Sequence, residues 1–339
     1  GQDRRGARPD PRLHEMTPNS AAAHGEGPPA KPPVSGSSAG SVPPSSGLPT
    51  LGIIVSALLL GSAGLFVILA EASAPTAAFL RCWIAVFVLA PLAILELRRH
   101  GLLPSRALVV AAVSGAALGI DYVLWAQSVL DAGVGVSTVL ISVQVIVFPA
   151  LVWVFGGTRP GWLFITCIPI MIIGMLLTGG VFGADEGAAN PERGAIFGVL
   201  SGILYGVYIF GIHHCRKAAP NFVVAPVAVG TIAAGVMTAI AGLLLGGLDF
   251  DLGWDGWAWM VALAVFGQAL SWVLLSISSP LVSVSRTAAL MLLQPLSAVV
   301  LGSVIAGERL QPAQWIGAVL VVIIVWIVGG GPEALRRRK

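Results

Sequence analysis

Apolar stretches of about 20 residues recur along this chain from Leu51 onward, and they constrain its fold more than any other feature. An α-helix rises about 1.5 Å per residue, so each stretch can cross a hydrocarbon core about 30 Å thick. Hydrophobic residues make up 56% of the 339 residues and charged residues 10%, compared with roughly 25% charged residues in soluble domains. A soluble fold could not bury so much apolar surface, so we expect the solvent to be lipid.

Only α-helices and closed β-barrels satisfy their backbone hydrogen bonds within a bilayer. The apolar stretches are too long and too continuously apolar to be barrel strands. We therefore predict an all-α polytopic membrane protein with ten transmembrane helices. The predicted helices span residues 51–70, 76–95, 107–126, 134–155, 162–182, 195–213, 223–247, 257–278, 282–306 and 312–330. Pro149 and Pro295 are expected to kink the fourth and the ninth of them, because proline removes a backbone hydrogen bond.

The distribution of lysine and arginine over the loops predicts the orientation. With the N-terminus in the cytoplasm, the cytoplasmic loops contain Arg98, Arg99, Arg106, Arg159, Arg216, Lys217 and Arg286. The opposite loops contain only Arg193 and Arg309 as basic residues, together with many acidic residues. We therefore predict a multi-pass protein of the cell (inner) membrane with both termini cytoplasmic.

The two ends of the chain differ from the apolar region. Residues 1–50 are rich in Pro, Ser and Gly and lack an apolar run, which predicts a disordered cytoplasmic N-terminal tail. Residues 331–339 form a basic cytoplasmic tail, which favours contact with anionic lipid.

The two halves of the apolar region show a weak internal repeat. Identical residues recur 150 positions apart, for example Gln144 and Gln294, and Gly157 and Gly307. We predict two five-helix repeats, residues 51–182 and 195–330. Because five is odd, the second repeat would insert in the opposite orientation, and the charges of the loops agree with this. Inverted repeats of this kind are a transporter architecture.

The end of the chain contains three sequence marks in order. They are Gln294-Pro295 within a helix, Gly307-Glu308-Arg309 at a turn, and Gly317 in the last helix. In these marks the segment 294–330 resembles the end of the EamA domain of the drug/metabolite transporter superfamily.

The first half also resembles this family, through the spacing of Pro75 and Arg81. The resemblance covers about residues 51–330 and implies two EamA-like domains, each being one five-helix repeat. The first half departs from the family pattern in having Val145 in place of a proline and Thr158 in place of the glutamate.

Two ionisable residues lie well inside the predicted helices, where an isolated charge costs a few kcal/mol or more. Arg81 and Asp121 are each about five residues from the outer end of adjacent antiparallel helices, so we expect them at similar depth and able to pair. The functional hypothesis makes Asp121 a proton-coupling carboxylate and Arg81 its partner or a ligand for a substrate carboxylate. The alternatives are a static salt bridge, or an Asp121 that faces an outer vestibule.

Polar and aromatic side chains predict a substrate cavity between the third, fourth, eighth and ninth helices, with a contribution from the sixth. Small-molecule sites are mostly apolar with a few converging polar groups. The candidate residues, besides Asp121 and Arg81, are Tyr122, Trp125, Gln144, Tyr205, Gln268, Trp272 and Gln294. Each of them could instead serve helix packing, but two pairs of near-equivalent positions, Tyr122 with Trp272 and Gln144 with Gln294, favour a pseudo-symmetric cavity.

Cofactor and metal sites are not expected. His213-His214-Cys215 lies at a helix end beside Arg216, so we interpret it as a boundary cluster and not as metal ligands. Cys82, Cys167 and Cys215 are scattered, which indicates neither a disulfide framework nor a metal site. The sequence contains no phosphate-binding GxxxxGK motif.

Together these features predict a secondary transporter, not an enzyme. We expect it to export a small metabolite, amino acid or drug-like compound by alternating access. Its expected partners are the small-molecule substrate and the lipid bilayer; a coupling proton and a homodimer are compatible with this, and nucleic acid is not expected. A membrane-embedded enzyme acting on a lipid or isoprenoid, and a sensor or assembly protein without transport, stay open as alternatives.

Overall fold

The computed structural model describes residues 47–156, 161–180, 188–282 and 284–328, and these belong to one compact unit of the chain. Within these ranges all regular secondary structure is helical and no strand occurs. The first helix begins at Gly47, inside the predicted tail 1–50. The rest of that tail, the turn residues 157–160 and the basic tail 331–339 lie outside the described residues.

The first half of the bundle follows the predicted helices closely. It consists of α1 (Gly47–Leu69), α2 (Ala74–His100), α3 (Ser105–Ala132), α4 (Val134–Leu140), the 3-10 turn η1 (Ile141–Val143), α5 (Gln144–Gly156) and α6 (Trp162–Thr178). The predicted fourth helix is therefore divided into α4 and α5 by η1. Its interruption lies before Pro149, which is inside α5, so the expected position of this kink was wrong.

The second half has two interruptions of the same kind. It consists of α7 (Pro191–Ala218), α8 (Ala225–Leu244), α9 (Gly253–Ala264), the π-helical segment η2 (Val265–Leu270), α10 (Ser271–Ser278), the 3-10 turn η3 (Ser279–Leu281), α11 (Val284–Met291), α12 (Leu293–Val304) and α13 (Pro312–Val328). The predicted ninth helix breaks at Leu292. Pro295 follows in the first turn of α12, where proline is tolerated best.

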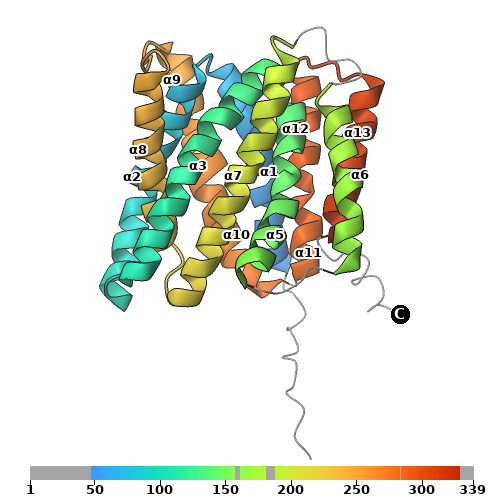
Figure 1. The fold of residues 1–339 in the computed structure, drawn as a ribbon. Coiled ribbons are helices and arrows are strands. Elements are labelled where there is room, and N and C mark those ends of the chain that lie inside the picture. The colour runs from blue at the N-terminus through green and yellow to red at the C-terminus, as the bar shows by residue number, and fades with distance from the viewer. Residues whose placement is uncertain (1–46, 157–160, 181–187, 283, 329–339) are drawn as a thin grey trace, which may run out of the picture. The chain divides into compact units, whose positions relative to one another are not determined.

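Seven helical segments in the described part of the chain are long and apolar enough to cross a membrane. Three shorter apolar helices, α6, α12 and α13, accompany them. Successive segments run in alternating directions, so that the start of α1 and the end of α13 lie at the same end of the bundle (Figure 1). The structure is thus that of a polytopic helical membrane protein.

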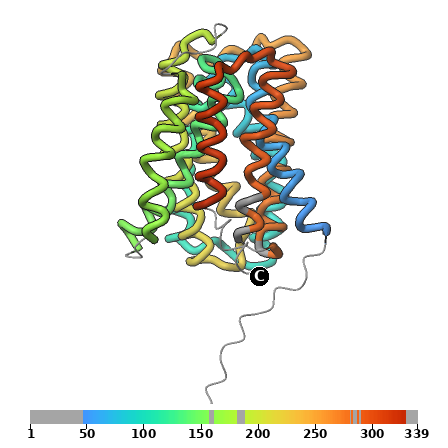
Figure 2. The backbone as a smooth tube through the Cα atoms, turned by 90° about the vertical axis from the view of Figure 1, so that its right-hand side faces the viewer, coloured from blue at the N-terminus to red at the C-terminus, as the bar shows by residue number. Residues whose placement is uncertain are grey.

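The major helix contacts join residues of the first half to residues of the second. α3 packs along α7 and α8, α2 along α8, and α1 along α10 and α12. α6 and α13 pack against each other at one edge of the bundle (Figures 1 and 2). Because the halves interlock, side chains from both converge at the centre of the bundle.

Gly115 permits the close crossing of α3 and α8. A Cβ atom at this position would lie 2.5 Å from the Cα atom of Gly230 and closer still to its carbonyl oxygen. Both partners in this contact are backbone atoms, which cannot move aside as a flexible side chain could. Glycine is therefore required here for the two backbones to meet.

Two glutamates tie the halves together at opposite ends of the bundle. Glu308, in the connection after α12, accepts hydrogen bonds from the backbone N–H groups of Val134 and, at 3.1 Å, Gly135 at the start of α4. We call this contact the α4 tie. A carboxylate fits this place because the first N–H groups of a helix have no partner within the helix and attract negative charge.

At the other end, Glu96 of α2 forms the α8 tie. Its two carboxylate oxygens accept from the backbone N–H groups of Val223, Val224 and Ala225 at 2.6 to 3.2 Å. Beside the α4 tie, Asp131 of α3 accepts two hydrogen bonds from Arg193 of α7, at 2.6 and 2.7 Å. Charged contacts between the halves therefore occur at both ends of the bundle.

The α4 tie can be tested with Glu308→Gln. An amide retains one acceptor oxygen but loses the charge and the second acceptor, so we expect a loss of about 1–3 kcal/mol, measured as a lower midpoint of thermal unfolding in detergent. Glu192→Gln is the matched control, because Glu192 is an exposed residue in the first turn of α7. Equal midpoints for the two variants would show that the tie does not stabilise the fold.

Candidate functional site

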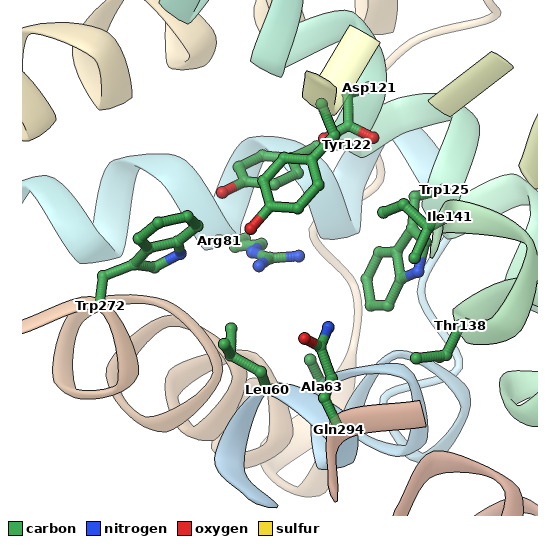
Figure 3. A pocket seen from close by; sticks show the side chains of 11 residues that line it. Leu60, Ala63, Arg81, Asp121, Tyr122, Trp125, Thr138, Ile141, Trp272 and Gln294 are labelled. Carbon is green, nitrogen blue, oxygen red and sulfur yellow. The ribbon is translucent and has the colours of Figure 1, made fainter. Parts of the chain in front are cut away.

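A small cavity lies at the centre of the bundle, between the two halves (Figure 3). Its volume is about 30 Å³, which is room for one or two water molecules. The lining residues come from both halves: Leu60, Ala63, Arg81, Asp121, Tyr122, Trp125, Thr138, Ile141, Tyr205, Trp272 and Gln294. We refer to this space as the central cavity.

Arg81 is the cationic group of the central cavity. It follows the first turns of α2, which Ser73 caps with a hydrogen bond to the N–H group of Thr76. The Arg81 side chain is 6% exposed, and its guanidinium lies 4.0 Å from the ring centroid of Tyr122 and 5.2 Å from that of Trp125. Cation–π contacts of this kind are worth about 2 kcal/mol or more when the cation is desolvated.

Gln268 holds Arg81 and Tyr122 together. Its side-chain oxygen accepts a hydrogen bond from Nε of Arg81 at 2.9 Å and from the Tyr122 hydroxyl at 2.6 Å. The carbonyl oxygen of Gly267 accepts a third, from Nη2 of Arg81 at 3.3 Å. Gly267 and Gln268 both belong to the π-helical segment η2, and π-helical turns recur at functional sites because they re-aim side chains and free backbone carbonyls.

Asp121 is the acidic group of the central cavity and is 1% exposed. Its Oδ1 atom accepts a hydrogen bond from the hydroxyl of Ser201, whereas its buried Oδ2 atom has no hydrogen-bond partner. The expected ion pair with Arg81 is not formed: Arg81 is bound by Gln268 and Gly267, and Asp121 by Ser201. The two residues nevertheless line the same cavity, as Figure 3 shows.

An aromatic cluster of Tyr205, Tyr208 and Trp272 adjoins the central cavity. The Trp272 ring meets those of Tyr205 and Tyr208 edge-on, each at 6.0 Å between centroids. The two tyrosine rings stack at 6.3 Å. The indole Nε1 atom of Trp272 is buried without a hydrogen-bond partner and points toward Arg81 (Figure 3). We call these three residues the aromatic triad.

Eight of the nine candidate residues meet at this site. Seven line the central cavity, and Gln268 binds two of them. The exception is Gln144, which packs near Gly206 on α7 and whose side-chain oxygen is buried without a partner. The cavity is also lined by α1 and α2, which supply Leu60, Ala63 and Arg81 and were not among the helices predicted to surround it.

Ser201, which binds Asp121, is a polar side chain at the site that sequence reasoning missed. It lies four residues before Tyr205 on α7, so the two share one helix face, and this spacing could have identified it. Thr138 of α4 and Ile141 of η1 also line the cavity, and their sequence carries no comparable signal.

The site combines charged and polar groups with apolar walls. Arg81 supplies a buried positive charge, Trp272 an unpartnered donor and Asp121 an unpartnered acceptor, while the aromatic rings supply apolar walls. At about 30 Å³ the central cavity is too small to hold an organic molecule. Occupation by a ligand therefore requires the surrounding helices to move apart.

Comparisons with known proteins give a consistent result. Residues 192–330 match the EamA-like transporter family. A curated protein described as an uncharacterized transporter, from Archaeoglobus fulgidus, is 26% identical over 277 residues, covering 81% of this chain and 94% of that protein. A solved crystal structure aligns with a TM-score of 0.55 and 15% identity, covering 83% of this chain and 96% of the other. The last likeness concerns the fold alone.

Fold, site and relatives together define a multi-pass helical membrane transporter, not an enzyme. More particularly, residues 192–330 match the EamA-like transporter family. For these residues, the family resemblance seen in the sequence is thereby confirmed.

The role of Gln268 leads to a paired prediction. Gln268→Leu leaves the buried Arg81 guanidinium and the Tyr122 hydroxyl without their shared acceptor, so we expect a loss of about 2–5 kcal/mol. Gln144→Leu removes an amide whose buried oxygen has no partner, so we expect it to be neutral or stabilising. Unfolding midpoints in detergent compare the two; equal destabilisation would contradict the assigned role of Gln268.

Proposed function

We propose that this protein is a secondary transporter that moves a small metabolite, amino acid or drug-like compound by alternating access. The central cavity is the observation that carries the proposal, because it combines buried ionisable groups with walls drawn from both halves of the chain. Intramembrane ionisable residues are functional candidates by default. A cavity between the two halves is where inverted-repeat transporters bind their substrates.

We further propose ten transmembrane segments in two inverted repeats, with both termini in the cytoplasm. The pattern of helix contacts supports this arrangement, because most of the major contacts have a counterpart when the halves are exchanged. Contacts of α3 with α7 correspond to contacts of α1 with α9–α10, and contacts of α1 with α12 to contacts of α5 with α7. The pairs α2–α8 and α6–α13 correspond to themselves. The family match over residues 192–330 covers the second repeat.

Interrupted helices in corresponding positions give further support. The turn η1 covers Ile141–Val143, and Leu292, where the second-half helix breaks, is 150 positions after Ser142. Paired interruptions of this kind mark the substrate site of inverted-repeat transporters. Ile141 and Gln294, one at each interruption, both line the central cavity.

Asp121 is the proposed proton-coupling group. A carboxyl that loses and regains a proton in the interior changes the charge of the cavity by one unit, which links substrate binding to a proton gradient. Ser201 holds one of its oxygens, and the other is without a partner, so a proton can be added there without breaking a hydrogen bond. Arg81 is the proposed ligand for a substrate carboxylate.

The direction proposed is export across the cell membrane. The small number of charged groups in the cavity favours a substrate with at most one or two charges over a multiply charged ligand such as a nucleotide sugar. The apolar and aromatic walls favour a substrate with an apolar part.

Asp121→Asn tests proton coupling. Asparagine preserves the shape and the bond with Ser201 but cannot exchange a proton, so we expect proton-driven transport in liposomes to fall at least tenfold while substrate counterflow persists. Candidate substrates are first selected by thermal-shift screening of amino acids, sugars and cationic drugs. Asp255→Asn, which changes an exposed acid in the first turn of α9, is the control. Unchanged proton-driven transport in Asp121→Asn would contradict the coupling role.

Single-cysteine labelling tests the topology. In a background without Cys82, Cys167 and Cys215, all three of which are buried, we place a cysteine at Ser105 or at Asp249. Ser105 is the first residue of α3, and Asp249 lies in the connection before α9. The two positions are at opposite ends of the bundle. An impermeant thiol reagent added to intact cells should label Asp249→Cys and spare Ser105→Cys. Labelling of both or the opposite pattern would contradict the proposed orientation.

A further inference from the structure

A second cavity lies beyond the aromatic triad, toward the end of the bundle where α7 and α10 finish. Its volume is about 210 Å³, much larger than the central cavity. It is lined by Phe148, Tyr208, Ile209, Ile212, His213, Arg216, Val227, Trp272, Leu275, Ser276 and Ser279. We call this space the vestibule. Trp272 lines both cavities, so the triad is the partition between them.

One face of α7 and one face of α10 form most of the vestibule. Residues 209, 212, 213 and 216 of α7 follow the spacing of a single helix face, as do residues 272, 275, 276 and 279 of α10 and η3. Each face begins with apolar or aromatic side chains near the triad and ends with polar ones. The vestibule therefore has an apolar floor and a polar rim.

The polar rim of the vestibule carries a positive charge. Arg216 is exposed and is joined there by His213 and by the hydroxyls of Ser276 and Ser279. No acidic side chain is among the lining residues. Glu96 of α2 uses both of its oxygens at the start of α8, in the α8 tie. Neither hydrogen bond nor ion pair to Arg216 occurs among the described residues.

We propose that the vestibule is a binding site for an organic monoanion, with a carboxylate at Arg216 and a ring or other apolar group against Tyr208, Trp272 and Phe148. One guanidinium with adjacent hydroxyls matches one carboxylate. The Phe148 ring also meets the His213 ring edge-on at 5.6 Å, so the apolar wall reaches the rim. The vestibule is distinct from the central cavity. Its assignment to the cytoplasmic side of the membrane rests on the proposed function, whereas the proposal that it binds an anion does not.

Binding of radiolabelled benzoate to the purified full chain in detergent tests this site. Benzoate carries one carboxylate on one ring, so we expect saturable binding, with benzyl alcohol, its uncharged counterpart, unable to compete. Arg216→Gln should weaken binding by about tenfold or more, and Arg216→Lys should restore part of it. Lys217→Gln removes a neighbouring charge that does not line the vestibule and should leave binding within about twofold.

Two cavity-narrowing variants locate the bound benzoate. Ser276→Leu fills the vestibule and should abolish binding, whereas Thr138→Leu narrows the central cavity and should leave it intact. The proposal is overturned if benzoate does not bind saturably, if Arg216→Gln binds as the parent chain does, or if Thr138→Leu alone abolishes binding. Proton-driven transport of the Asp121→Asn variant is a separate measurement, so this site and the proposed coupling can fail independently.

Discussion

The buried guanidinium of Arg81 is the group on which the centre of this structure depends. A cation inside a lipid-embedded bundle is costly unless hydrogen bonds and aromatic faces replace the water it has lost. Here the replacement comes from three places: the Gln268 oxygen, the Gly267 carbonyl, and the faces of Tyr122 and Trp125. These groups belong to α3 and to the segment between α9 and α10. Satisfying one charge thus fixes the mutual positions of α2, α3 and η2.

The same need explains a π-helical segment in the middle of an apolar helix. A regular α-helix uses each carbonyl for the residue four positions later, which leaves little capacity for a side chain. In η2 the Gly267 carbonyl is available to Arg81, and Gln268 is aimed at the same group. The irregularity of the backbone is stabilised by the charge that it accommodates. Such backbone is compatible with the membrane interior because it is buried in protein and not exposed to lipid.

The sequence predicted the helices well because membrane helices follow from composition and length alone. It also predicted most of the polar and aromatic residues that meet at the central cavity, since ionisable and amide side chains are rare in apolar helices and stand out there. It failed where tertiary contacts decide the outcome. Arg81 and Asp121 are at similar depth, yet their bonds go to Gln268 and Ser201, and helix depth carries no information on this choice. Likewise, η1 lies before Pro149, and nothing in the local sequence indicates the π-helical turn at Gln268.

Within the proposed cycle, the position of the aromatic triad has a mechanical consequence. Trp272 lies four residues after Gln268, so the side chain that partitions the two cavities follows directly on the segment that Arg81 holds. A substrate carboxylate that binds the Nε–Nη2 edge of Arg81 competes with Gln268 and Gly267 for the same N–H groups. Binding at this edge weakens the contacts that fix η2, and with them the placement of Trp272. The charged ties at the two ends, from Glu308 to α4 and from Glu96 to α8, join the halves far from this point. For the central cavity to open toward the vestibule, α10 must move first. Neither the α4 tie nor the α8 tie has to break for this movement.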